Sequence, residues 1–88
     1  AGLKRIVDQR IAQLLTETGQ PGEAIRLLGK ATDAASLEAL GDAQAKLGQN
    51  AQARTSYSQA LRQLETGSPQ RQVVEIKLVE AGGSVPNA

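Results

Sequence analysis

Histidine, cysteine, tryptophan, phenylalanine and methionine are all absent from this chain of 88 residues, and Tyr57 is its only aromatic residue. Without cysteine, the chain can form neither a disulfide nor a thiolate metal site. Without histidine, it lacks the commonest general base, and no serine or threonine has a base close by in the sequence to activate its hydroxyl. We therefore expect a non-catalytic protein with no catalytic residue, no cofactor and no metal ion.

An excess of charge of one sign and a long hydrophobic run are also missing. The ten basic and nine acidic residues are interspersed and leave a net charge of +1. A nucleic-acid surface or a contact with anionic lipid needs clustered basic residues, and a membrane-spanning helix needs about 20 apolar residues. We expect neither nucleic acid as a partner nor direct membrane contact. Because the chain does not begin with methionine, we also expect it to be a fragment of a longer protein.

Apolar residues recur at spacings of three and four through most of the chain, which is the period of helices with one buried face. Glycine and proline interrupt the pattern at 19–22 and at 66–69. The pattern predicts helices over about 3–18, 21–30, 34–47, 50–65 and 69–81. Thr32 or Asp33 can cap the third of these, Asn50 the fourth and Ser68 the fifth.

Two of the predicted helices carry broad apolar faces. The first should bury a stripe made of Leu3, Val7, Ile11, Leu14 and Leu15. The last should cover the open apolar side of the helices before it, because a stack of helices needs a closing element. Its apolar residues are Val73, Val74, Ile76, Leu78 and Val79. Residues 84–88 should then form a flexible tail.

Residues 40–61 predict two closely packed helices with a tight reversal between them. Gly41 lies inside a helix, where glycine costs about 1 kcal/mol relative to alanine, so we expect the next helix to cross too close for a Cβ atom. Ala53 and Ala60 are small for the same reason, and Tyr57 fills the gap between them. Tyr57 could offer a functional hydroxyl, but a packing wedge is the simpler interpretation. Gly48 suits the positive φ of a helix end, and the facing apolar residues are Ala39, Leu40, Ala43 and Leu47.

An internal repeat relates this hairpin to the one before it. Gly48, Ala53, Tyr57 and Ala60 each lie 29 residues after a similar residue, namely Gly19, Ala24, Leu28 and Ala31. The repeat predicts two hairpins, at about 3–31 and 34–65, followed by the helix at 69–81.

The hairpin at 34–65 resembles the tetratricopeptide repeat, a helical hairpin with a period of about 34 residues. The resemblance is carried by Leu40, Gly41, Ala53, Tyr57 and Ala60. Leu37 stands where the motif has tryptophan, and Glu65 where it has proline. The resemblance implies an all-α, right-handed helical-hairpin solenoid that occupies residues 1–83.

Over about 6–83, the chain is similar to the C-terminal part of the YfgM-like family of bacterial tetratricopeptide proteins, ancillary subunits of the Sec translocon. The matching segments are Arg10–Ala12, Gly41–Ala43, Gly48, Ala53–Arg54, Tyr57 and Val74–Leu78. The resemblance implies a membrane anchor upstream and a place on the periplasmic side of the bacterial inner membrane. It also implies protein partners: a translocon component, a chaperone or an unfolded polypeptide.

In tetratricopeptide arrays the first helix of each repeat lines the concave face. By position in the motif, a partner-binding groove would include Gln9, Gln13, Glu17, Glu38, Asp42 and Lys46. Glu38 and Asp42 stand four residues apart and could approach like a carboxylate pair. A solvated face with Asp42 beside Lys46 is the preferred interpretation.

A structural role in self-assembly is the alternative function. The first helix has no preceding repeat in this sequence, so it could expose Ile6 and Leu14. Exposed apolar faces of this kind favour association. A homodimer through the end faces of the repeats is therefore a second expectation.

Overall fold

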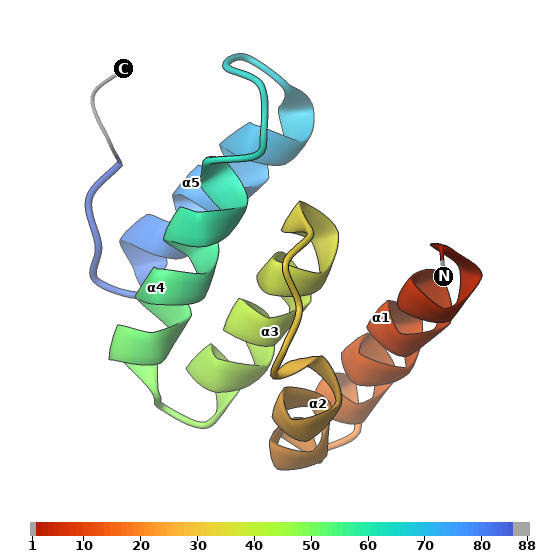
Figure 1. The fold of residues 1–88 in the computed structure, drawn as a ribbon. Helices are drawn as coiled ribbons and strands as arrows, with labels where there is room; N and C mark the ends of the chain where they lie inside the picture. Colours follow the sequence, from red (N-terminus) through yellow and green to blue (C-terminus); the bar gives the residue numbers. More distant parts are fainter. Residues whose placement is uncertain (1, 86–88) are drawn as a thin grey trace.

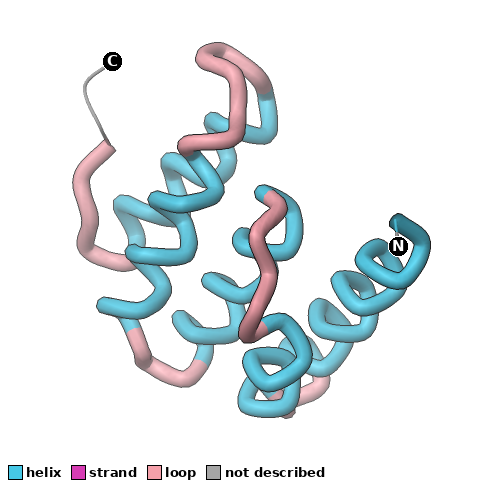
Figure 2. Tube along the Cα trace, in the orientation of Figure 1, coloured by secondary structure: helices cyan, strands magenta, loops and turns pink. Residues whose placement is uncertain are grey.

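The computed structural model describes residues 2–85, which form five α-helices joined by short loops (Figures 1 and 2). The helices are α1 (Gly2–Glu17), α2 (Pro21–Leu28), α3 (Ala34–Lys46), α4 (Asn50–Leu61) and α5 (Pro69–Glu80). Residues 2–85 contain no strand. The predicted all-α fold of two helical hairpins and a further helix is confirmed.

The helices stand in a row, with α1 at one end and α5 at the other (Figure 1). The α1–α2 hairpin packs against α3, and α5 packs against α4. Helix α3 therefore has neighbours on both sides, whereas α1 and α5 each have a neighbour on one side only.

Helix starts follow local capping chemistry in two of the three predicted positions. The Asp33 side chain accepts a hydrogen bond from the Ser36 amide at 3.0 Å, so Asp33 and not Thr32 caps α3. Ser68 accepts one from the Arg71 amide at 3.1 Å and caps α5. The expectation for Asn50 is wrong, because α4 already includes it and Gln49 precedes the helix without a side-chain cap. Helices α2 and α4 also end earlier than predicted, at Leu28 and Leu61.

Asp33→Ala should lower the free energy of unfolding by about 1 kcal/mol, because the amides of the first turn of α3 lose their side-chain acceptor. Thr32→Ala is the matched control, since only its backbone carbonyl is engaged, by the Gln63 side chain. That change should stay within about 0.5 kcal/mol. Urea denaturation followed by circular dichroism measures both, and equal losses would contradict the assignment of the cap.

The α3–α4 hairpin is built on the close crossing that the sequence predicts. A Cβ added at Gly41 would lie only 2.5 Å from Tyr57 Cε1. Tyr57 is 3% exposed, and the small residues on either side of it, Ala53 and Ala60, are fully buried. Gly48 has φ = 78° at the reversal. Glycine is thus required at position 41 because a Cβ would collide with Tyr57, and at position 48 because the backbone has positive φ.

The first hairpin repeats this arrangement 29 residues earlier. Gly19 has φ = 88° at the reversal, and Ala24 and Leu28 are buried like their counterparts in α4. In α1 the counterpart of Gly41 is Ala12, which has no exposed surface. A small residue at the helix crossing is therefore common to both repeats.

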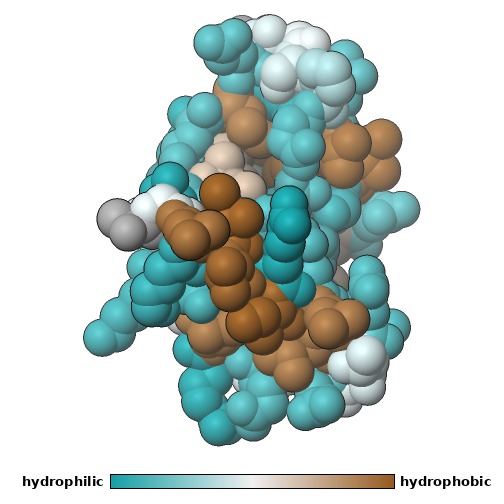
Figure 3. All heavy atoms as spheres, turned by 90° about the vertical axis from the view of Figure 1, so that its right-hand side faces the viewer, coloured by the Kyte–Doolittle hydropathy of each residue, from teal (hydrophilic) through white to brown (hydrophobic). Residues whose placement is uncertain are grey.

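The prediction that the apolar stripe of α1 is buried is wrong, because most of this stripe faces away from the other helices. Helix α1 contacts α2 and α3 around Ala12, so the opposite face has no neighbour among the described residues. That face forms an exposed apolar ridge, seen as the brown band in Figure 3. The ridge consists of Leu3, Ile6, Val7, Ile11 and Leu14, with Leu3 and Leu14 exposed to 74% and 60%. Only Leu15 of the predicted stripe packs partly against the core. Leu47, also expected to be buried, is exposed.

Helix α5 is fastened to α4 near both of its ends. Near the start of α5, the Arg71 guanidinium donates to the Leu61 carbonyl at 2.7 Å. At its end, Arg54 of α4 donates to the Ala81 carbonyl at 2.9 Å. Between these bonds α5 buries Val74 and Leu78, which confirms its contact with the second hairpin.

The other apolar residues of α5 do not share in this packing. Val73, Ile76 and Val79 are exposed, contrary to the expectation that the apolar residues of this helix cover the hairpin. Helix α5 has two opposed apolar faces, and α4 covers only one of them. Val85 lies beside the outer face, and residues 86–88 of the predicted tail lie outside the described residues.

Candidate functional site

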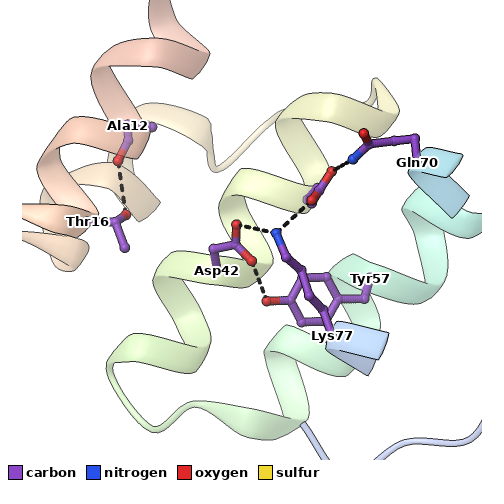
Figure 4. A network of polar contacts seen from close by, with 7 residues as sticks. Ala12, Thr16, Asp42, Tyr57, Gln70 and Lys77 are labelled. Carbon is purple, nitrogen blue, oxygen red and sulfur yellow. Dashed lines mark hydrogen bonds and ion pairs between the residues drawn. The ribbon is translucent and has the colours of Figure 1, made fainter. Parts of the chain in front are cut away.

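A polar cluster joins α3 to α5 on one face of the row of helices. The Lys77 ammonium lies 2.6 Å from Glu38 Oε2 and 3.0 Å from Asp42 Oδ2 (Figure 4). The Tyr57 hydroxyl donates to Asp42 Oδ1 at 2.7 Å, and the Gln70 amide donates to Glu38. The cluster therefore fixes the distance between α3 and α5.

The surroundings of the cluster shift two pKa values in the same direction. Burial lowers the pKa of Lys77, but the hydrogen bonds to Glu38 and Asp42 outweigh burial and hold it above its ordinary 10.5. Burial is also the main reason why the pKa of Tyr57 is raised above its ordinary 10.0, and the hydrogen bond to the Asp42 carboxylate adds to it. Lys77 stays charged and Tyr57 stays neutral throughout the physiological range.

Beside this cluster the surface between α3 and α5 is hollowed. This polar hollow has a volume of about 410 Å³ and is lined by Asp42, Ala45, Lys46, Asn50, Tyr57, Lys77, Glu80 and Ala81. Its walls carry charges of both signs together with an amide group. Such a surface offers both hydrogen-bond donors and acceptors, which the backbone of an extended polypeptide also presents.

The predicted groove residues divide into two groups. Asp42 and Lys46 line the polar hollow, and Glu38 lies next to it in the cluster. No hydrogen bond or ion pair within residues 2–85 links Gln9, Gln13 or Glu17 to this site. These three residues of α1 therefore remain predictions.

The preferred interpretation of Asp42 is wrong. Its ion-pair partner is Lys77, 35 residues away, and not Lys46 on the same helix. Glu38 and Asp42 are not a bare carboxylate pair either, because the ammonium of Lys77 contacts both. A lysine from a neighbouring helix can reach two carboxylates spaced four apart, whereas Lys46 is exposed and forms no ion pair within residues 2–85.

Sequence reasoning missed Lys77, Gln70 and Glu80. All three lie on α5, at least 28 residues beyond Asp42, so no local pattern connects them to Glu38 and Asp42. One available signal was the pair of carboxylates on one helix face, since such a pair calls for a cation nearby.

Residues 2–85 contain no group of three or more acidic side chains placed to share a metal ion. No helix among these residues is long and apolar enough to cross a membrane.

Two helical hairpins of the same design, stacked side by side with a further helix and an open polar surface, define an all-α helical-repeat protein. The family model of the tetratricopeptide repeat-like domain matches residues 1–83, and the chain belongs to this family. This match confirms the tetratricopeptide resemblance. Domains of this family are generally protein-interaction modules, in agreement with the expected interaction role. Comparisons with curated proteins and with solved structures found no match.

Proposed function

We propose that this chain is a non-catalytic interaction domain that binds an extended or unfolded polypeptide in the polar hollow between α3 and α5. The observation that carries the proposal is the hollow itself, whose lining combines two cations, Lys46 and Lys77, with two carboxylates, Asp42 and Glu80, and with Tyr57. Its mixed charges suit weak contacts with many sequences better than tight recognition of one charged group.

The rigidity of the site supports this role. Because Lys77 already holds Glu38 and Asp42, α3 and α5 stay at a fixed separation before a partner arrives. A preformed site loses less conformational entropy on binding. Lys46 and Glu80 are exposed and remain available to a partner.

The resemblance to YfgM-like proteins supports a more specific role. In this proposal the domain lies on the periplasmic side of the bacterial inner membrane, tethered by an anchor outside the present sequence. There it would assist secretion or chaperoning at the Sec translocon, with emerging polypeptides, a chaperone or a translocon component as partners.

Binding can be tested with the isotope-labelled chain and a permanently unfolded, carboxymethylated polypeptide. We expect amide NMR shifts to concentrate at the residues that line the polar hollow, above all at Asp42, Lys46 and Glu80. Ala45→Trp places an indole in the hollow, whatever the charge of the partner, and should weaken binding roughly tenfold, which corresponds to about 1.4 kcal/mol.

Ala35→Trp is the matched control, because Ala35 is exposed on the same helix but does not line the hollow. It should leave the affinity unchanged, and circular dichroism should show that both variants fold. Shifts confined to α1 and α2, or equal losses in the two variants, would overturn the proposed site.

A further inference from the structure

The apolar ridge of α1 exposes five large apolar side chains, and comparison with the second repeat shows which surface of the fold it corresponds to. The residues 29 positions after Val7, Ile11 and Leu14 are Ser36, Leu40 and Ala43. In α3 these three residues are buried, and both α1 and α2 pack against α3. Ser36 lies beside Asp8 of α1 and Leu28 of α2. The ridge is therefore the face that, one repeat later, is covered by the preceding helices.

The ridge differs from its counterpart in size. Ser36 and Ala43 are small and allow a helix to pack closely on α3, whereas Val7 and Leu14 project from α1. A flat helix surface would leave gaps around these larger side chains. The complementary surface for the ridge should instead be recessed.

A recessed apolar surface exists at the other end of the row, on the outer face of α5. This apolar hollow has a volume of about 410 Å³ and is lined by Gln72, Glu75, Ile76, Val79, Glu80 and Val85. Ile76 is 60% exposed and Val79 is 54% exposed. Because α1 and α5 lie at opposite ends of the molecule (Figure 1), one chain cannot seat its own ridge in its own hollow.

The charges on the two surfaces are opposite. Arg10 is exposed on the same face of α1 as Val7 and Leu14, three and four residues away, and it has no ion-pair partner among the described residues. Glu80 is exposed at the apolar hollow and also lacks an ion-pair partner within residues 2–85. The basic residues of α5 are already engaged, Arg71 with Glu75 and Lys77 with the acidic pair of α3.

From these observations we infer that copies of this chain associate head to tail, with the apolar ridge of one copy seated in the apolar hollow of the next. Arg10 of one copy then meets Glu80 of the other. Pairing of two ridges would instead bury Arg10 against an apolar surface without a partner, which is costly. A heterologous contact of this kind leaves one ridge and one hollow free, so it extends into open chains or closes into rings.

This inference does not rest on the function proposed for the polar hollow, although Glu80 lines both hollows. The ridge variants of α1 lie away from the polar hollow and therefore test association alone. Analytical ultracentrifugation of the complete 88-residue chain over a range of concentrations tests it. The average mass should continue to rise beyond that of a dimer as the concentration increases. A chain that stays monomeric at millimolar concentration would overturn the inference.

Charge reversal distinguishes head-to-tail association from a symmetric dimer. Arg10→Glu and Glu80→Arg should each weaken association at least about tenfold, because each puts like charges at the contact. An equimolar mixture of the two variants should associate again. Where the ridge of the Glu80→Arg chain meets the hollow of the Arg10→Glu chain, the original charge pair is kept. In the opposite contact the pair is reversed and still attractive. Lys30→Glu, an exposed change on the α2 side, is the control and should have no effect.

Blocking variants give a second, sharper readout. Leu14→Glu should disable the ridge and Ile76→Glu the apolar hollow, and both positions are exposed, so the fold should be kept. Each variant alone should be monomeric, and their mixture should form a heterodimer that grows no further. Association that persists in Ile76→Glu, or a mixture that stays monomeric, would overturn the head-to-tail arrangement.

Discussion

Gly41→Leu should lower the free energy of unfolding by about 4 kcal/mol, more than the roughly 1–3 kcal/mol that an overpacked core usually costs. The new Cβ alone would lie 2.5, 2.8 and 2.9 Å from three ring carbons of Tyr57. The ring cannot move aside, because it is 3% exposed and its hydroxyl is bonded to Asp42. Helices α3 and α4 must therefore separate, and urea denaturation followed by circular dichroism measures the loss.

Two further substitutions make this expectation specific. Gly22→Leu places the same side chain in α2, where a Cβ meets nothing within 4 Å, and should stabilise the protein by up to about 1 kcal/mol through helix propensity. Leu61→Ala removes a buried side chain and should cost about 3 kcal/mol. If Leu61→Ala proved more damaging than Gly41→Leu, the crossing at Gly41 would not be the tight point of the hairpin.

The stability of the protein should fall steeply above pH 10. The pKa of Tyr57 is raised in the folded state, so the folded chain holds its phenolic proton more tightly than the unfolded chain does. This stabilisation is complete below the unfolded pKa of about 10 and is lost as the pH rises toward the folded pKa, by about 1.4 kcal/mol per unit. The raised pKa of Lys77 acts in the same direction, because its ion pairs are lost at still higher pH. We expect a loss of roughly 2–3 kcal/mol at pH 12 from Tyr57 alone.

Tyr57→Phe separates the contribution of Tyr57 to the loss of stability at high pH from that of Lys77. It lacks the phenol, so its free energy of unfolding should fall less steeply between pH 10 and pH 12 than that of the original chain, although it is about 1 kcal/mol less stable at neutral pH. Because Tyr57 is the only tyrosine, the absorbance of tyrosinate reports its ionisation directly. Parallel pH profiles for the two chains would show that the phenol does not contribute.

Features that depend on neighbours in sequence could be predicted from the residues alone. Gly19 and Gly48 adopt positive φ because a helix ends at each of them, and Ser68 caps a helix that begins at Pro69. The close crossing at Gly41 was also predictable, since a glycine inside a helix needs a reason and a tyrosine stood in the facing helix.

Features that depend on distant partners could not be predicted. The spacing of Leu3, Val7, Ile11 and Leu14 shows that one face of α1 is apolar, but not that any helix covers it. For the same reason the ion pairs of Lys77 were missed, because they depend on how α5 lies across α3. The sequence therefore located residues of the candidate site on α3 but none of those on α5.

The order in which the helices touch has a consequence for folding. Each helix packs only against helices one or two places away in the chain, and the longest-range ties are the side-chain contacts from α5 to α3. Chains whose contacts are mostly local need little loop closure and fold quickly. Such a row can also open from an end while the middle stays folded. Helix α1, which buries one alanine completely and leaves its ridge bare, is the end from which opening should begin.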